Sequence, residues 1–196
     1  GLFTGNNVSG ITFNPTTAGN QVITYTYTDN YGCQAIEKDT IYVCPLPSIT
    51  FNNPTSVCAN ANAFSLNAIP AGGTFSGSGV NAGTFIPTQV TPGTYTIYYN
   101  YTNYLGCSNI DSFQITVHAL PQVVFNYTGG SLCPYQAAFT LNATPAGGTF
   151  SGNGISTPNL FTPANATIGS NILTYTYTDL FSCTSSDTTS ITILPI

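Results

Sequence analysis

The chain repeats itself with a period of about 75 residues. The heptapeptide Ala-Gly-Gly-Thr-Phe-Ser-Gly occurs at residues 71–77 and again at 146–152. A segment rich in Tyr and Thr at residues 23–29 recurs at 97–103 and at 173–179. A fixed period of this length indicates one structural unit used repeatedly, and such arrays supply length or several contact surfaces rather than a single active site.

The repeats predict how the chain is divided. Residues 1–5, Gly-Leu-Phe-Thr-Gly, correspond to the Gly-Thr-Phe-Ser-Gly part of the later repeats. We therefore expect the front of the first repeat to be missing, and the sequence to be a piece of a longer protein. The expected segments are the C-terminal part of repeat 1 at 1–45, repeat 2 at 46–119 and repeat 3 at 120–196.

Residues 94–102 alternate in the way that half-buried strands do. Tyr95, Ile97, Tyr99 and Tyr101 fall on one face, and no helical periodicity competes with this pattern. Shorter strands are expected at 48–51, 63–68, 73–76, 84–87 and 112–117. Six or seven short antiparallel strands in each unit predict an all-β fold of tandem immunoglobulin-like β-sandwich repeats in an elongated rod.

Charged side chains are scarce, which excludes some partners. The chain has one Lys or Arg and six Asp or Glu among 196 residues. Phosphate contacts require clustered cations, so nucleic acid and anionic membrane surfaces are excluded as partners. We also find no apolar run of membrane-spanning length and expect no membrane insertion. The many Tyr and Phe residues at regular strand positions argue against disorder.

The order of these motifs resembles a known repeat family. Taken together over the repeats, the order is a Cys, then Pro-Ala-Gly-Gly-Thr-Phe-Ser-Gly-x-Gly, Phe-x-Pro, Tyr-Thr-Tyr-Thr-Asp, Gly-Cys and Ile-Thr-Val. This order resembles the Ig-like or PKD-like repeats of giant cell-surface adhesins of the Bacteroidota, over the whole chain. The resemblance implies export by type IX secretion, and in some members a link to gliding motility. One departure is Phe181-Ser182-Cys183, where the family has Gly before Cys.

Six cysteines without metal-type spacing, in a chain read as secreted, predict disulfides. Two arrangements are open. Pairing within repeats gives Cys58–Cys107 and Cys133–Cys183. Pairing between repeats gives Cys58–Cys183 and Cys44–Cys107, and leaves Cys33 and Cys133 to flanking repeats.

We favour pairing between repeats. Cys58 precedes strand B and Cys107 follows strand F, and these ends of an immunoglobulin sandwich lie opposite one another. Strands of six residues separate such ends by roughly 20 Å, whereas a disulfide needs Cα atoms within about 7 Å. This arrangement also accounts for Cys44. A unit that lacks one strand would bring the two ends together and favour pairing within repeats.

No catalytic, cofactor-binding or metal-binding residues are predicted. His118 is the single histidine, and a solvated linker residue explains it better than a catalytic base does. Gly77 and Gly79 follow a short strand but open no helix, so turn geometry explains them better than a dinucleotide loop. Asp29 and Asp179 are expected to stabilise turns through Asx-type hydrogen bonds, and the scattered acids form no calcium loop. For Tyr98, stacking on a sugar and cross-strand packing both remain open.

A short motif resembles Bacteroidota O-glycosylation sites. It is Asp followed by Ser or Thr and then an aliphatic residue or Thr, and its candidate acceptors are Thr40 and Thr188, with Ser112 in a degenerate copy. We expect the three copies at equivalent positions of the repeats.

These features together predict a structural stalk segment of a large secreted, extracellular cell-surface adhesin. It would project a distal adhesive or motility element, contact neighbouring repeats of the same chain, and contact the secretion or surface-anchoring machinery. Two alternatives remain: the repeats themselves bind a glycan or a protein, or the chain is an accessory region of a secreted hydrolase. An enzyme within these residues is not expected.

Overall fold

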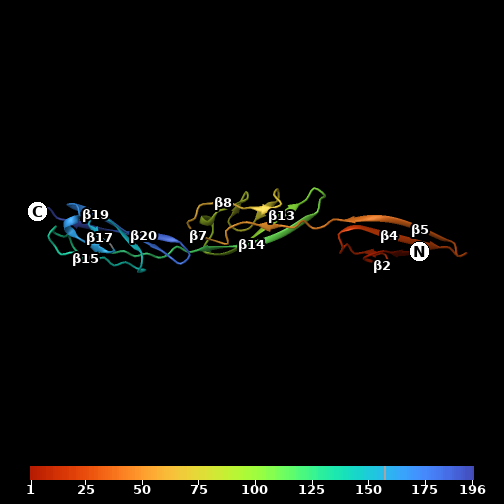
Figure 1. The fold of residues 1–196 in the computed structure, drawn as a ribbon, viewed down its shortest axis with the longest axis horizontal. Helices are drawn as coiled ribbons and strands as arrows, with labels where there is room; N and C mark the ends of the chain where they lie inside the picture. The colour runs from red at the N-terminus through yellow and green to blue at the C-terminus, as the bar shows by residue number, and fades with distance from the viewer. Residues whose placement is uncertain (157) are drawn as a thin grey trace. The chain divides into compact units, whose positions relative to one another are not determined.

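The computed structural model describes residues 1–156 and 158–196. Strands dominate these residues, and the helical segments among them are two short 3-10 turns, η1 at Pro87–Gln89 and η2 at Pro163–Asn165 (Figure 1). The predicted all-β class is confirmed. The chain forms two compact units: the first comprises residues 1–53, 66–76 and 98–113, and the second comprises 54–65, 77–97 and 114–196.

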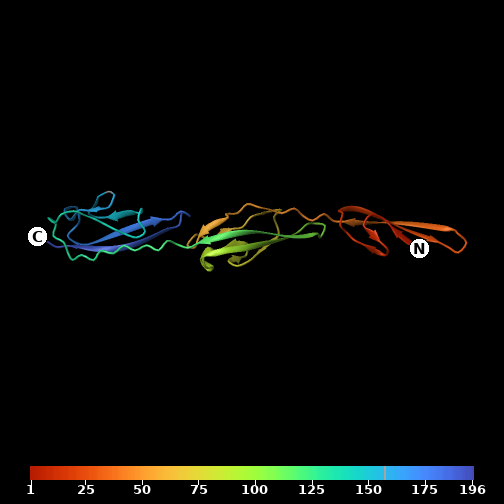
Figure 2. The same cartoon turned by 90° about the horizontal axis from the view of Figure 1, so that it is seen from below.

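The first unit contains a three-stranded sheet near the N-terminus. β4 (Gly19–Thr28) lies between β1 (Leu2–Thr4) and β5 (Gln34–Val43), and all pairings are antiparallel. The β4–β5 pair is the orange hairpin in Figures 1 and 2. A small ribbon, β2 (Val8–Ser9) with β3 (Thr12–Phe13), follows β1.

The first unit also contains parts of predicted repeat 2. β6 (Thr50–Phe51) pairs with β9 (Ala68–Ile69), and β10 (Thr74–Ser76) pairs with the end of β13 (Gly93–Thr102). β13 neighbours β14 (Ser108–His118), and both long strands contribute residues to the two units.

Two of the sheets in the second unit surround one core. One sheet has the order β16 (Thr149–Gly152), β19 (Gly169–Thr178), β20 (Thr184–Ile193), and the other has the order β15 (Phe139–Thr140), β18 (Leu160–Phe161), β17 (Ile155–Ser156). The buried core consists of Phe125, Leu141, Phe161, Leu173, Tyr175, Ile191 and Ile193. Two sheets that enclose such a core form a β-sandwich, as predicted.

Period-two alternation explains which side chains of the long strands are buried. Ile97 and Tyr99 on β13 are buried and Tyr98 between them is exposed. On β19, Leu173 and Tyr175 are buried in the same way. The face predicted from residues 94–102 is therefore confirmed, because successive side chains of a strand point to opposite faces.

Three details of the predicted strands are wrong. The segment 63–68 is not one strand: β8 (Phe64–Ser65) pairs with β12 (Thr84–Phe85), whereas β9 pairs with β6. β12 ends at Phe85 because η1 begins at Pro87, which has no N–H for a strand ladder. β7 (Ser56–Cys58) was not predicted, and it pairs in parallel with the end of β14, so that Cys58 faces His118.

The repeated Pro-Ala-Gly-Gly segment receives a buried tyrosine. The Gly148 N–H donates a hydrogen bond to Tyr175 Oη at 2.7 Å, and Tyr175 Oη donates to the Pro145 carbonyl. A Cβ atom at Gly148 would lie 2.6 Å from Tyr175 Cζ, so only glycine fits there. Tyr99 makes the same two bonds in repeat 2. This contact explains why the motif recurs, since a buried hydroxyl must be paired.

Candidate functional site

Three turns of the same construction each present a cysteine. Asp29 Oδ1 accepts hydrogen bonds from the N–H groups of Tyr31 at 2.8 Å and Cys33 at 2.9 Å. In the other two turns the cysteine N–H donates to the acceptor four residues earlier, from Cys107 to Asn103 at 3.0 Å and from Cys183 to Asp179 at 2.9 Å. The predicted Asx-type bonds of Asp29 and Asp179 are confirmed. These bonds fix the backbone of the cysteine and hence the position of its sulfur.

The residue before each cysteine has a left-handed backbone conformation. Its φ angle is 86° at Gly32, 83° at Gly106 and 65° at Ser182. Glycine tolerates this region without steric cost, whereas serine does not. The departure from Gly-Cys noted in the sequence therefore leaves the turn geometry unchanged and adds backbone strain at Ser182.

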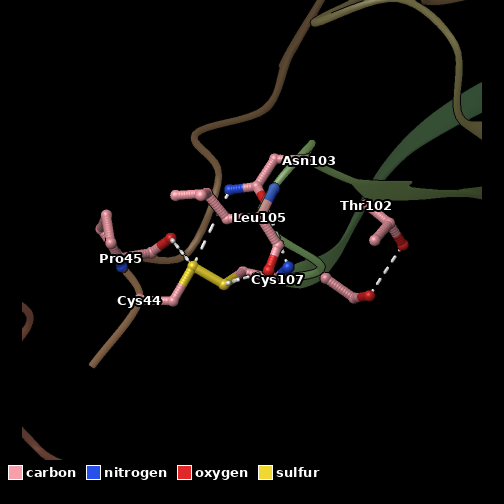
Figure 3. Close-up of a disulfide and its surroundings, with 7 residues drawn as sticks. Cys44, Pro45, Thr102, Asn103, Leu105 and Cys107 are labelled. Atoms are coloured by element: carbon pink, nitrogen blue, oxygen red, sulfur yellow. Dashed lines mark hydrogen bonds between the residues drawn. A yellow bond between two sulfur atoms is a disulfide. The ribbon is translucent and has the colours of Figure 1, made fainter. Parts of the chain in front are cut away.

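The turn of β13–β14 carries a disulfide in the first unit (Figure 3). Cys107 is bonded to Cys44, which directly follows β5, and the Cα atoms are 6.3 Å apart. The amide of Asn103 contacts Cys44 Sγ at 4.0 Å. Next to this bond the side chain of Asn109 donates to the Pro47 carbonyl at 2.8 Å. The short linker after β5 is thus held by one covalent bond and one hydrogen bond.

The turn of β19–β20 carries a disulfide in the second unit. Cys183 is bonded to Cys58 at the end of β7, with Cα atoms 5.5 Å apart, and Cys183 is fully buried. Beside it the His118 ring stacks on Phe181, with ring centroids 3.9 Å apart and an interplanar angle of 10°. The Ala59 N–H donates to the His118 carbonyl at 2.9 Å. His118 is therefore a packing residue at the end of β14, and the prediction of a solvated linker residue is wrong.

Cys33 and Cys133 are exposed and without a disulfide partner in the described residues. Pairing within repeats, Cys58–Cys107 and Cys133–Cys183, is not the arrangement in the structure. β7 pairs in parallel with the end of β14 and places Cys58 opposite His118. Because the His118 ring stacks on Phe181, two residues before Cys183, this pairing explains why Cys58 lies close to Cys183. The connectivity of the protein in solution stays a prediction, and peptide mapping under non-reducing conditions tests it.

Asp187 has a role that the sequence did not indicate. Its Oδ2 accepts a hydrogen bond from the Phe125 N–H at 2.9 Å, and its Oδ1 accepts one from the Thr188 N–H at 2.8 Å. Two residues along β20, Thr189 Oγ1 accepts from the Tyr127 N–H at 3.2 Å. The hydrogen bonds from Phe125 and then Thr188 lower the pKa of Asp187. These two side chains of an edge strand therefore hold the extended segment 123–127.

The three candidate glycosylation acceptors are exposed, but they are not at equivalent positions. Thr40, Ser112 and Thr188 each follow an Asp, and the N–H of the Thr or Ser donates a hydrogen bond to the carboxylate of that Asp. Thr188 and Ser112 lie five residues after the cysteine of their turn, whereas Thr40 lies seven residues after Cys33. The register agrees, because Tyr25 pairs with Glu37 while Tyr175 pairs with Asp187. The expectation of equivalent positions is wrong for Thr40; use of these residues as acceptors stays a prediction.

Other predicted features fit turns and packing. Gly79 has a φ angle of 77°, and a Cβ atom there would lie 2.9 Å from Val90, in agreement with turn geometry. Tyr98 is 49% exposed on β13.

Over residues 1–156 and 158–196, no group of three or more His, Cys, Asp or Glu side chains is arranged to hold a metal ion. Within the same residues no helix is long and apolar enough to cross a membrane.

No protein-family model matches the chain, and no curated protein sequence matches it either. Among solved structures it is similar to a Ca²⁺-stabilized adhesin that helps an Antarctic bacterium bind ice, with 13% identity and a TM-score of 0.43. That alignment covers 90% of this chain and 57% of the adhesin, so the chain spans less than two thirds of its length. Mouse protocadherin-24 EC1-3 matches with 11% identity and a TM-score of 0.30, covering 100% of this chain and 89% of that one. Drosophila OTK extracellular domains 3-5 match with 11% identity and a TM-score of 0.32, covering 91% and 72%.

Proposed function

We propose that the chain is a stalk segment of a large secreted cell-surface adhesin, in which disulfides between successive repeats resist extension. The observation that carries this proposal is that the cysteines of two equivalent turns form disulfides. Cys107 and Cys183 occupy the same place in two turns, and each is bonded to a cysteine from the preceding predicted repeat, Cys44 and Cys58. Both bonds close long stretches of chain, with sequence separations of 63 and 125 residues.

Long closed loops suit a segment that transmits force. In the chain-entropy model a disulfide over loops of this length stabilises the folded state by about 4–5 kcal/mol. The covalent bond also sets an upper limit to extension, because the residues inside a closed loop cannot be pulled out. Disulfides of this kind persist in oxidising compartments, which supports an extracellular location.

The finer part of the proposal concerns the source and the partners. The motif order supports an adhesin of the Bacteroidota type, exported by type IX secretion and linked to gliding motility. Its partners would be neighbouring repeats and the secretion or anchoring machinery. Thr40 and Thr188, and by analogy Ser112, would be O-glycosylated. Native material should then show extra mass on the peptides that contain Thr40 and Thr188, and unmodified peptides at both positions would contradict this part.

Exposed aromatic residues favour one alternative, a repeat-borne binding module. Tyr31 and Tyr104 lie in equivalent turns, two residues before Cys33 and three residues before Cys107, and are 92% and 94% exposed. Exposed tyrosines are typical of protein- and glycan-binding surfaces. Retention of the chain on a glycan array, lost on Tyr104→Ala, would favour this alternative over a purely structural stalk.

Single-molecule stretching tests the stalk proposal directly. Pulled from its two ends with both disulfides formed, the chain cannot extend the 125 residues between Cys58 and Cys183. Reduction should release them and lengthen the fully extended chain by roughly 400 Å, at about 3.3–3.6 Å per residue. In Cys58→Ser the Cys44–Cys107 bond still closes a loop with a sequence separation of 63 residues. The gain in extended length should therefore be smaller than the gain on reduction by the length of that loop. Equal lengths before and after reduction would contradict the proposal.

A further inference from the structure

In repeat 2 one asparagine side chain clamps the backbone of a second asparagine. The Asn67 N–H donates a hydrogen bond to Asn53 Oδ1 at 2.8 Å, and Asn53 Nδ2 donates one to the Asn67 carbonyl at 2.8 Å. A primary carboxamide carries both an acceptor and donors, so a single such group satisfies the N–H and the C=O of one residue. Both asparagines belong to the first unit.

The same two positions of repeat 3 hold Tyr127 and Asn142. An isolated bridge in repeat 3 corresponds to the pairing of β6 with β9 in repeat 2 and fixes the register of the two segments. Counted from these pairings, Tyr127 takes the place of Asn53, and Asn142 takes the place of Asn67. The carboxamide of the clamp is therefore replaced by a phenol ring in repeat 3.

The side chain of Tyr127 has other contacts. Its ring stacks on Phe139, with centroids 5.7 Å apart and an interplanar angle of 23°, and its hydroxyl donates to the Gly130 carbonyl at 3.1 Å. Over residues 1–156 and 158–196 no hydrogen-bond partner is found for the N–H or the C=O of Asn142. The two backbone groups that are clamped in repeat 2 are thus open in repeat 3.

A hollow lies where the clamp would be. It has a volume of about 220 Å³ and lies between the segments 125–129 and 139–142, so Tyr127 and Asn142 both line it. A second hollow of about 200 Å³ begins at Leu141 and Asn142 and reaches residues 146–148. The described side chains that line the two hollows are uncharged. Asn142 thus offers one donor and one acceptor in a neutral site with room beside it.

We infer that the hollow at Asn142 binds the side-chain carboxamide of an Asn or Gln residue of a partner polypeptide. The amide oxygen accepts a hydrogen bond from the Asn142 N–H, and the amide nitrogen donates one to the Asn142 carbonyl, as Asn53 does for Asn67. The second hollow receives residues that flank this side chain in the partner. The inference does not depend on the stalk proposal, because it concerns a surface within one repeat.

The two backbone groups distinguish a primary amide from similar ligands. A carboxylate has only acceptors, so an Asp or Glu side chain would place an oxygen against the Asn142 carbonyl. The acetamido group of an N-acetylated sugar is a trans secondary amide, in which the N–H and the C=O point in opposite directions. It can therefore bond to only one of the two groups. The site selects an Asn or Gln side chain over both.

A short peptide tests the inference on the intact chain. The probe is acetyl-Val-Asn-Val N-methylamide, whose only primary amide is the Asn side chain, and binding is followed by NMR. The titration extends to about 10 mM, so that even a dissociation constant near 1 mM would give saturation. Saturable shifts are expected at the Asn142 backbone and at Tyr127. The corresponding Asp peptide should bind at least about tenfold more weakly, because the Asn142 carbonyl loses its donor.

N-acetylglucosamine is titrated in the same way and should give no saturable shifts at Asn142. The inference is overturned if the Asn peptide gives no saturable shifts at this residue, or if the Asp peptide binds equally well. Saturation of the same residues by N-acetylglucosamine would also overturn it and would identify a sugar as the ligand.

Variants of the chain complete the test. Tyr127→Asn places a carboxamide of the chain itself in the hollow and should abolish binding of the Asn peptide, whereas Tyr127→Ala leaves the Asn142 groups open and should retain it. Asn53→Ala removes the clamp of repeat 2 and should add a second set of saturable shifts, at Asn67. Loss of binding in both Tyr127 variants, or absence of new shifts in Asn53→Ala, would contradict the role assigned to the backbone groups.

Discussion

The sheets β1–β4–β5 and β16–β19–β20 have the same order, the same long hairpin and the same turn, yet they differ in burial. Tyr175 is 1% exposed and Ile191 is fully buried, whereas Tyr25 is only partly buried and Ile41 is 41% exposed. The difference lies in what faces them. In the second unit the segment 123–127 and the sheet β15–β18–β17 pack against this face.

This comparison separates two sources of structure. The hairpin and its turn form in both units, because alternation and the Asx-type bonds are encoded by neighbouring residues. Burial of the aromatic face requires segments that are distant in sequence. Because the hydrophobic contribution scales with the area removed from water, equivalent residues should contribute very differently to stability in the two units.

The largest expected effect is at the equivalent tyrosines. Tyr175→Ala should reduce the free energy of unfolding of the second unit by about 3–5 kcal/mol, because it leaves a large cavity in the core. Tyr25→Ala should cost less than half of this, since the ring is partly exposed already. Amide hydrogen exchange in β19 and β4 measures the two losses separately. Equal losses would mean that the aromatic face of the first unit is covered in solution.

Removal of one hydroxyl sharpens the comparison. Tyr175→Phe leaves the Gly148 N–H and the Pro145 carbonyl without their partner, at a cost of about 1–3 kcal/mol. Tyr99→Phe should cost a similar amount, because Tyr99 makes the same two bonds. Chemical denaturation of both variants, with Tyr98→Phe as an exposed control, provides the measurement. A cost no larger than that of the control would contradict the role assigned to the Pro-Ala-Gly-Gly segment.

Two of the turns have glycine before the cysteine and the third has Ser182, and replacing this serine should be stabilising. Ser182→Gly removes the strain of a left-handed serine and should raise the free energy of unfolding of the second unit by up to about 1 kcal/mol. Gly106→Ser is the reciprocal change and should destabilise the first unit by a similar amount. Thermal unfolding of the two variants under oxidising conditions tests both. Destabilisation by Ser182→Gly would show that the serine side chain makes a contribution of its own.

The smallest expected effect is a pH dependence confined to the second unit. Hydrogen bonds from the Phe125 and Thr188 N–H groups hold the pKa of Asp187 below its ordinary value. A depressed folded-state pKa adds stability above the unfolded-state pKa near 3.9, and this stability is lost as the pH falls through the folded-state pKa. Hydrogen exchange of the segment 123–127 should therefore accelerate below about pH 4. Asp187→Asn should remove this pH dependence, and persistence of it would assign the titration to another group.

The sequence by itself determined the local elements. Alternation at residues 94–102 predicted the buried face of β13, and Asp29 and Asp179 marked their turns, because these features depend on residues within a few positions of one another. The pattern of cysteines limited the disulfides to two arrangements. The period of about 75 residues predicted the repeated unit, and the alternating short strands predicted its all-β class.

Tertiary structure alone decided the long-range contacts. The parallel pairing of β7 with β14 rests on three residues, too few for a periodic pattern. Asp187 looked like part of a glycosylation motif, and its bond to Phe125, 62 residues away, could not be read from neighbouring residues. The tyrosine hydroxyl that binds the Pro-Ala-Gly-Gly segment is a contact of the same kind. Such contacts depend on which segments the chain brings together, and local propensity does not encode that choice.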